Sequence, residues 1–188
     1  MDIILASASP RRKELLSKIF SDFKIIPSDA EDKAEVFLPP KQKVQYLAKI
    51  KAQDIKNKYN NALVIGSDTI VALDDNILEK PKSKDDAIKM LENLSGRTHS
   101  VFTAVCICYD DKEVSFVEET KVTFEKMTDK EIKDYTDTDE PYDKAGAYGI
   151  QGLACKYISK IDGDYFNVCG LPVSKLYYTL KEILGESL

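Results

Sequence analysis

The sequence contains a single histidine, His99, and only four cysteines among its 188 residues. None of the cysteines forms a C-x-x-C pair, and structural zinc sites normally gather four cysteine and histidine ligands, so we do not expect such a site. Each cysteine lies in an apolar stretch. We therefore interpret Cys106, Cys108, Cys155 and Cys169 as buried, reduced thiols, which are typical of a cytoplasmic protein.

Long apolar runs are also missing. No run approaches the length of about 20 residues that a membrane span requires, and the N-terminal order of apolar, polar and basic residues does not fit a signal peptide. We therefore expect a cytoplasmic protein with no membrane partner. The net charge of −5 repels nucleic acid, so a polyanionic ligand would require a local basic pocket.

Common nucleotide-binding signatures are absent as well. The sequence has no G-x-x-x-x-G-K-[ST], which excludes a P-loop enzyme. It also has no G-x-G-x-x-G and no G-x-S-x-G, so the commonest dinucleotide-binding and α/β-hydrolase patterns are excluded too.

Hydrophobic residues at 43% and charged residues at 31% fit a globular chain, and 188 residues suit one domain. We find no repeat and no long linker, so residues 1–188 are predicted to form a single domain. Strands and helices alternate, and two strand pairs look like antiparallel hairpins, which predicts an α/β fold with a mixed sheet. Strands are expected at 3–6, 23–26, 63–73, 101–109, 114–124 and 155–161. Helices are expected from Pro10, from Pro40, from Ser83 to Leu94, at 129–135 and at 171–184. Asp74, Asp75 and Asn76 are expected to form a hairpin turn, and Ser83 with Asp86 resembles a capping box in which Asp replaces Glu.

The first candidate for chemistry is the segment from Ser7 to Arg12. Ser9 and Pro10 have the form of a helix N-cap and first turn, which places Arg11 and Arg12 where cations oppose the helix dipole. An anion bound there, such as phosphate, would remove this conflict. The alternative is that both arginines simply reach solvent.

The second candidate is Asp68, which interrupts the apolar strand 63–73. A buried and unpaired carboxylate costs several kcal/mol, so a metal ion or a cationic neighbour is expected beside it. Asp68 would then bind Mg²⁺ or Mn²⁺, or orient a water for attack on phosphorus. The alternative is a strand-end aspartate that bonds to the local backbone.

Three lysines and the single histidine are weaker candidates. Lys80 precedes a proline, which holds it extended, whereas Lys51 lies on the long helix and Lys144 in a glycine-containing loop. Taken singly, each lysine is expected to be a solvated surface residue. His99, at a helix-to-strand junction, is a candidate general base, although a lone histidine more often has a structural role.

Six blocks in order resemble the Maf family of nucleoside triphosphate pyrophosphatases, over nearly the whole chain. They are S-A-S-P-R-R-K-E-L-L at 7–16, G-S-D-T at 66–69, E-K-P at 79–81, L-S-G-R-T-H-S-V-F-T-A-V at 94–105, E-P-Y-D-K-A-G-A-Y-G-I-Q-G at 140–152 and D-G-D-Y-F-N-V-C-G-L-P at 162–172. The resemblance implies an elongated mixed sheet flanked by helices, related to inosine triphosphate pyrophosphatases, with a cleft between two lobes. It leaves a homodimer open.

The resemblance also implies an activity, which is cleavage of a nucleoside triphosphate to the monophosphate and pyrophosphate with a divalent cation. Asp68 matches the proton acceptor of the family. The residues that match its phosphate-side positions are Ser7, Arg11, Lys51 and Lys80. A second carboxylate for the metal is Glu31 or Asp32, a choice that the sequence leaves open. These positive and negative groups would face each other across the triphosphate.

Three residues indicate base preference within the family. Arg12, Thr69 and Gln151 match the branch that acts on dTTP and UTP, and the Gln151 amide offers both a donor and an acceptor to the edge of uracil or thymine. Glu79 departs from the glycine that is frequent before Lys-Pro in this family. The alternatives are a non-enzymatic, nucleotide-sensing regulator of septum formation and a pyrophosphatase for purine analogues such as ITP.

Overall fold

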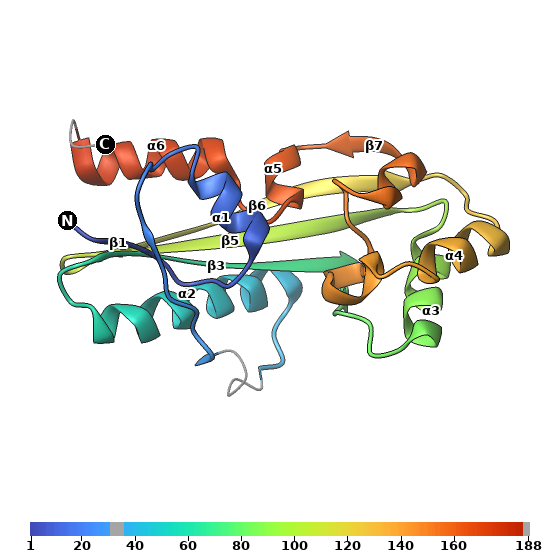
Figure 1. The fold of residues 1–188 in the computed structure, drawn as a ribbon, viewed down its shortest axis with the longest axis horizontal. Coiled ribbons are helices and arrows are strands. Elements are labelled where there is room, and N and C mark those ends of the chain that lie inside the picture. The colour runs from blue at the N-terminus through green and yellow to red at the C-terminus, as the bar shows by residue number, and fades with distance from the viewer. Residues whose placement is uncertain (31–35, 186–188) are drawn as a thin grey trace. The chain divides into compact units, whose positions relative to one another are not determined.

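The computed structural model describes residues 1–30 and 36–185. Within these residues the strands form a seven-stranded sheet in the order β2-β1-β3-β5-β6-β7, with β4 paired to β3 (Figure 1). Their bounds are β1 Ile3–Leu5, β2 Lys24–Ile25, β3 Leu63–Leu73, β4 Asn76–Leu78, β5 Thr98–Tyr109, β6 Lys112–Phe124 and β7 Ile158–Asp162. β1 runs parallel to β2 and β3, whereas β4 and β7 run antiparallel to their neighbours, so the predicted mixed sheet is confirmed.

Helices occupy the predicted places with small shifts. Their bounds are α1 Pro10–Leu16, α2 Pro40–Lys58, α3 Lys84–Leu94, α4 Asp129–Thr136, α5 Tyr165–Val168 and α6 Val173–Leu184. Short 3₁₀ helices are η2 Glu140–Asp143, η3 Ala145–Ala147 and η4 Leu153–Tyr157. None of the helices in the described ranges is long and apolar enough to cross a membrane.

The described chain divides into two compact units. The first unit is Met1–Asp68, Thr103–Glu118 and Gly170–Leu188, and the second is Thr69–Phe102 and Glu119–Cys169. Several of these boundaries fall inside the long strands β3, β5 and β6, each of which contributes residues to both units. Within the described residues, the division at these strands therefore does not follow a linker.

In the first unit, α1 and α6 lie on one face of the sheet and α2 lies on the other (Figure 1). The buried stripe of α2 includes Val44, Ala48, Ala52 and Ile55, at the spacing of a helix that packs on a sheet. Gly66 of β3 allows this helix to approach closely. A Cβ atom on Gly66 would lie 2.5 Å from Ala48 O and 2.7 Å from Ala52 N, which leaves no room for any side chain.

In the second unit, the turn between β3 and β4 has positive φ at Asp74 (50°) and Asp75 (64°). This is the backbone of a type I′ hairpin turn, as the sequence predicted at residues 74–76. Ser83 caps α3 by accepting a hydrogen bond from Asp86 N, whereas Asp86 itself accepts from Lys82 N rather than from the cap residue. The predicted capping box at α3 is therefore only half formed.

The predicted strand at 155–161 is wrong in its first half. Residues Leu153–Tyr157 form η4, and the strand begins at Ile158, where β6 becomes available for pairing. Cys155 therefore lies on an exposed 3₁₀ turn, and its prediction as a buried thiol is wrong, whereas Cys106, Cys108 and Cys169 are buried as expected. Helix α5 was not predicted; it begins at Tyr165, and Asp164 is its N-cap.

Candidate active site

Asp68 and Lys51 form a buried ion pair in the first unit. Lys51 Nζ lies 2.8 Å from Asp68 Oδ1, and the two side chains are only 7% and 12% exposed. Lys51 belongs to the buried stripe of α2, and the close approach at Gly66 brings that stripe against β3. The interpretation of Lys51 as a solvated surface lysine is wrong, and the cation that Asp68 required is this residue.

The sequence carries a signal for this pairing. Lys51 follows Val44 and Ala48 by seven and three residues and precedes Ile55 by four, so it falls on the apolar face of its helix. A lysine at such a position requires an anionic partner, because burying it alone is costly. The interrupted strand at Asp68 requires a cation for the same reason.

Ser7 and Arg12 form a second polar cluster in the first unit. Arg12 Nη1 donates to Ser7 Oγ at 3.0 Å, and Arg12 Nε donates to the carbonyl oxygen of Gly170 at 2.9 Å. The hydroxyl of Ser67, next to Asp68 in the chain, donates to the same Gly170 oxygen at 3.4 Å. The opening of α1 is thus linked to the centre of β3 through one carbonyl group.

Helix α1 begins as predicted, with Ser9 as its N-cap and Pro10 in its first turn, and it has no acidic residue there. It is only seven residues long, so its dipole contributes little, and the guanidinium groups themselves carry the positive charge. Both Arg11 and Arg12 are half-buried, so neither simply reaches solvent.

The two clusters lie on different faces of β3. Side chains alternate along a strand, and both Gly66 and Asp68 face α2. Ser67 faces the opposite side and contacts Gly170, as Arg12 does. The placement of positive and negative groups across a triphosphate stays a prediction.

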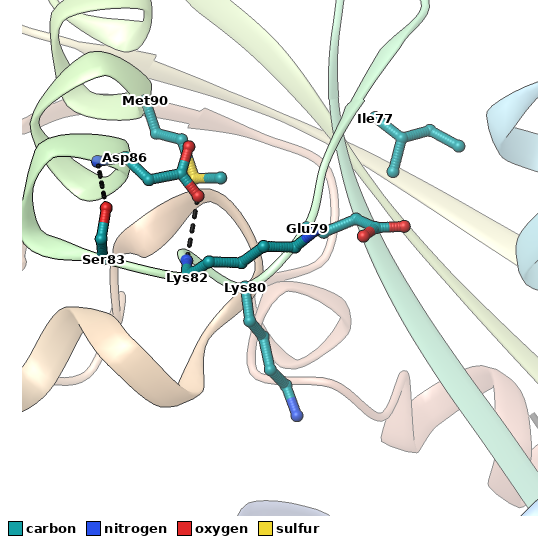
Figure 2. A pocket seen from close by; sticks show the side chains of 7 residues that line it. All are labelled: Ile77, Glu79, Lys80, Lys82, Ser83, Asp86 and Met90. Atoms are coloured by element: carbon teal, nitrogen blue, oxygen red, sulfur yellow. Dashed lines mark hydrogen bonds between the residues drawn. The ribbon is translucent and has the colours of Figure 1, made fainter. Parts of the chain in front are cut away.

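Lys80 belongs to the second unit, where it lines a surface pocket of about 450 Å³ (Figure 2). Its ammonium group points away from Asp86, and Pro81, which follows it, is buried. The lining of the pocket contains two lysines and two carboxylates, so their charges cancel, and binding of a triphosphate there would require further cations. The lining residues are Ile77, Glu79, Lys80, Lys82, Ser83, Asp86 and Met90.

Gln151 and Thr69 also belong to the second unit. Gln151 is exposed, and it occupies the third position of a tight turn in which Gly152 N donates to Gly149 O at 3.1 Å. Thr69 is half-buried on β3, next to Asp68 in the chain. Of the residues that indicate base preference, only Arg12 lies in the first unit.

A family model described as Maf-like protein matches residues 2–183 of the chain. The chain belongs to the Maf family.

Two Maf relatives are similar over almost their whole length. The dTTP/UTP pyrophosphatase of Koribacter versatilis (strain Ellin345) is 48% identical over 181 residues, which covers 96% of this chain and 94% of the relative. The dTTP/UTP pyrophosphatase of Carboxydothermus hydrogenoformans is 49% identical over 185 residues, covering 97% and 98% of the two chains.

Among solved structures, a HAM1 protein from Coxiella burnetii matches the Maf chain with a TM-score of 0.57. The match covers 100% of both chains at only 15% sequence identity, so it shows the fold alone. The predicted α/β fold, a mixed sheet flanked by helices, is confirmed.

The surroundings of His99 in this Maf chain indicate a structural role. It is buried between the rings of Phe124 and Tyr148, and its Nε2 lies 2.7 Å from the Tyr148 hydroxyl. Its Nδ1 has no hydrogen-bond partner among the described residues. Burial lowers the pKa of His99 to about 4, so the ring is neutral near pH 7. This environment favours the structural role over that of a general base.

The stability of the protein should fall as the pH is lowered from 6.5 to about 4, because the unfolded chain takes up a proton at His99 that the folded protein excludes. The expected loss from this residue is about 3 kcal/mol at pH 4 and below. Urea unfolding of the wild type and of His99→Phe across this range measures the difference. NMR titration of the chain's single histidine provides a check, and a midpoint at the ordinary histidine value would contradict the prediction.

The buried thiols Cys106 and Cys108 lie near Glu113, and potential ligand atoms of the three residues fall within 4.8 Å of one another. The Glu113 carboxylate already binds two side-chain donors. It accepts from Lys49 Nζ at 2.6 Å and from Gln53 Nε2 at 2.7 Å. We therefore interpret this cluster as an ion pair that lies beside two core thiols.

Some predicted site residues are not brought together by the described structure. Glu31 and Asp32, the alternatives for the second carboxylate, lie outside the described residues. Lys144 Nζ bonds within its own loop, to Glu140 O at 2.8 Å and to Asp143 Oδ1 at 2.5 Å. Motif reasoning missed the carbonyl of Gly170 and the hydroxyl of Ser67, although both lie in blocks that the Maf motif covers.

Proposed function

We propose that this chain is a nucleoside triphosphate pyrophosphatase that hydrolyses dTTP and UTP to the monophosphate and pyrophosphate in the cytoplasm. The observation that carries the proposal is the buried Lys51–Asp68 pair, at 2.8 Å, in a chain that is 48% identical over 181 residues to a dTTP/UTP pyrophosphatase. A protein that only binds nucleotide does not require a carboxylate held at this position.

In the proposed reaction, Asp68 accepts a proton from the water that attacks the α-phosphorus, and pyrophosphate leaves. Lys51 Nζ donates to Asp68 Oδ1 at 2.8 Å, which holds the carboxylate in place for this proton transfer. Arg11 and Lys80 stabilise the negative charge that develops on the pyrophosphate. Ser7 positions the phosphate chain, and its hydroxyl already holds Arg12.

The carboxylate of Asp68 has donor chemistry that suits a divalent cation. Asp68 offers a hard oxygen donor, and Mg²⁺ typically takes one or two carboxylates from the protein and its remaining ligands from phosphates and waters. We propose that Asp68 holds Mg²⁺ or Mn²⁺ together with Glu31 or Asp32. When bound, the ion neutralises charge on the triphosphate.

A release assay across nucleotides tests this function. Purified protein should release pyrophosphate and the monophosphate from dTTP and UTP, in a manner dependent on added Mg²⁺ or Mn²⁺, and faster than from dCTP or ITP. Nucleotide binding without pyrophosphate release would favour the nucleotide-sensing regulator. Faster release from ITP would favour the purine-analogue enzyme.

Replacement of Gln151 by alanine should relax base choice. We expect the preference for dTTP over dCTP, measured as the ratio of kcat/KM values, to fall by about tenfold, because the amide no longer pairs with the base edge. Tyr178→Ala, at an exposed residue of α6 in the first unit, serves as a control with unchanged preference. If the Gln151 variant kept the wild-type ratio, Gln151 would not be the residue that reads the base.

A further inference from the structure

The carboxylate of Glu140, in the second unit, accepts hydrogen bonds from three donors. Glu140 Oε1 accepts from the Tyr135 hydroxyl at 2.8 Å and from Ala154 N at 3.3 Å, and Glu140 Oε2 accepts from Leu153 N at 2.7 Å. Burial, followed by the nearby Glu140, raises the pKa of Tyr135 above its ordinary value, so its hydroxyl stays protonated and donates. Hydrogen bonds to an ionised acceptor are stronger than neutral ones.

These donors bracket the turn that carries Gln151. Leu153 and Ala154 follow the turn directly, and Gly149 N, at its start, donates to the Tyr135 hydroxyl at 3.4 Å. The turn closes on itself through Gly152 N and Gly149 O. Both ends of the turn are therefore tied to the pair formed by Glu140 and Tyr135.

The two glycines of the turn pack against residues of the same group. A Cβ atom on Gly152 would overlap the Glu140 carboxylate, and one on Gly149 would lie 2.8 Å from Lys144 Cε. Lys144 in turn donates to the main-chain oxygen of Glu140 at 2.8 Å. A turn with two glycines loses much backbone freedom on folding, so it requires such an anchor to keep one conformation.

We propose that Glu140 is a positioning residue for base recognition, which acts by holding the Gly149–Gly152 turn so that the Gln151 amide meets the donor and acceptor edge of a uracil or thymine base. This inference rests on the proposed function, since it takes Gln151 as the residue that reads the base. Glu140 itself touches no substrate. Its effect on specificity is exerted through Gln151.

A double-mutant cycle tests the proposal. We would measure kcat and KM for dTTP and dCTP with the wild type, Glu140→Gln, Gln151→Ala and the double variant. Glu140→Gln should lower the dTTP-to-dCTP ratio of kcat/KM by about tenfold, mainly through KM for dTTP, because one amide oxygen cannot replace the carboxylate. The double variant should be no less selective than Gln151→Ala alone, since the two residues act as one unit.

Glu131→Gln is the matched control. Glu131 belongs to the same unit and also accepts two hydrogen bonds, from Thr128 N and Thr128 Oγ1, each at 2.8 Å, but it caps α4 and does not contact the turn. This variant should keep the wild-type base preference. Equal losses for dTTP and dCTP in Glu140→Gln, or additive losses in the double variant, would overturn the proposal and leave Glu140 a purely structural role.

Hydrogen exchange without substrate separates this inference from the proposed function. The amides of Leu153 and Ala154 should exchange faster in Glu140→Gln than in Glu131→Gln. Unchanged exchange would overturn the positioning role even if the enzyme were active. A wild-type protein that failed to hydrolyse dTTP and UTP would instead overturn the proposed function, whereas faster exchange in Glu140→Gln would still support the anchoring of the turn.

Discussion

Asp68→Asn should reduce kcat for pyrophosphate release from dTTP by about 10²- to 10⁴-fold, the range that a positioned general base contributes. Asparagine has nearly the same shape as aspartate, but it is not ionised and cannot accept the proton of the attacking water. The measurement is pyrophosphate release under saturating dTTP and metal ion, with circular dichroism to establish that the fold is retained.

Ser67→Ala is a suitable comparison for this variant. Ser67 is adjacent in the chain and fully buried, but its hydroxyl faces Gly170 on the other side of β3. We expect it to lose about 1 kcal/mol of stability from one hydrogen bond, with a much smaller effect on kcat than Asp68→Asn. If Asp68→Asn kept more than about a tenth of wild-type activity, the assignment of Asp68 as proton acceptor would be wrong.

Lys51→Met should destabilise the protein by about 3 to 5 kcal/mol, because it leaves the Asp68 carboxylate buried without its cation. Methionine keeps most of the length and apolar surface of lysine, so the loss reports the charge rather than a cavity. Urea unfolding at neutral pH, analysed for both the midpoint and the slope, measures this free energy.

Lys49→Met is the matched control on the same helix. Lys49 also forms an ion pair, to Glu113 at 2.6 Å, but its side chain is 45% exposed and screened by solvent, so the expected loss of stability is much smaller than for Lys51→Met. The double variant Lys51→Met/Asp68→Asn should recover part of the lost stability without recovering activity, because no charge is left buried. A loss in Lys51→Met no larger than in Lys49→Met would show that the buried pair does not matter for stability.

The candidate site could be predicted in part, because its residues break local rules. Arg11 and Arg12 oppose the dipole at the opening of a helix, and Asp68 interrupts an apolar strand. Each violation marks a residue of interest, but neither identifies a partner. Lys51 and Asp68 are 17 residues apart and lie on different elements. Their pairing depends on the packing of α2 against Gly66, which local sequence patterns do not specify.

The strand predicted around Cys155 and the role of Glu140 could not be derived from the sequence, because both depend on contacts between separate segments. The apolar run around Cys155 resembles a strand, yet only residues from Ile158 onward pair with β6, so the earlier part forms the 3₁₀ turn η4. Glu140 lies within a Maf motif, but the motif indicates no role for it, because its three donors come from α4 and from the segment after the turn. Strand pairing and carboxylate contacts are long-range or loop-dependent, so single-sequence patterns do not reveal them.

What the sequence determined by itself was local: the helix caps at Ser9 and Ser83, the turn at residues 74–76, the alternation of strands and helices, and the ordered Maf motifs. These features depend on neighbouring residues, whose preferences are fixed by backbone sterics and hydrogen bonding. The tertiary structure alone decided which partner each buried polar residue contacts. That outcome depends on the desolvation of charges by distant segments, as at Lys51, Asp68 and His99, and no segment contains this information in isolation.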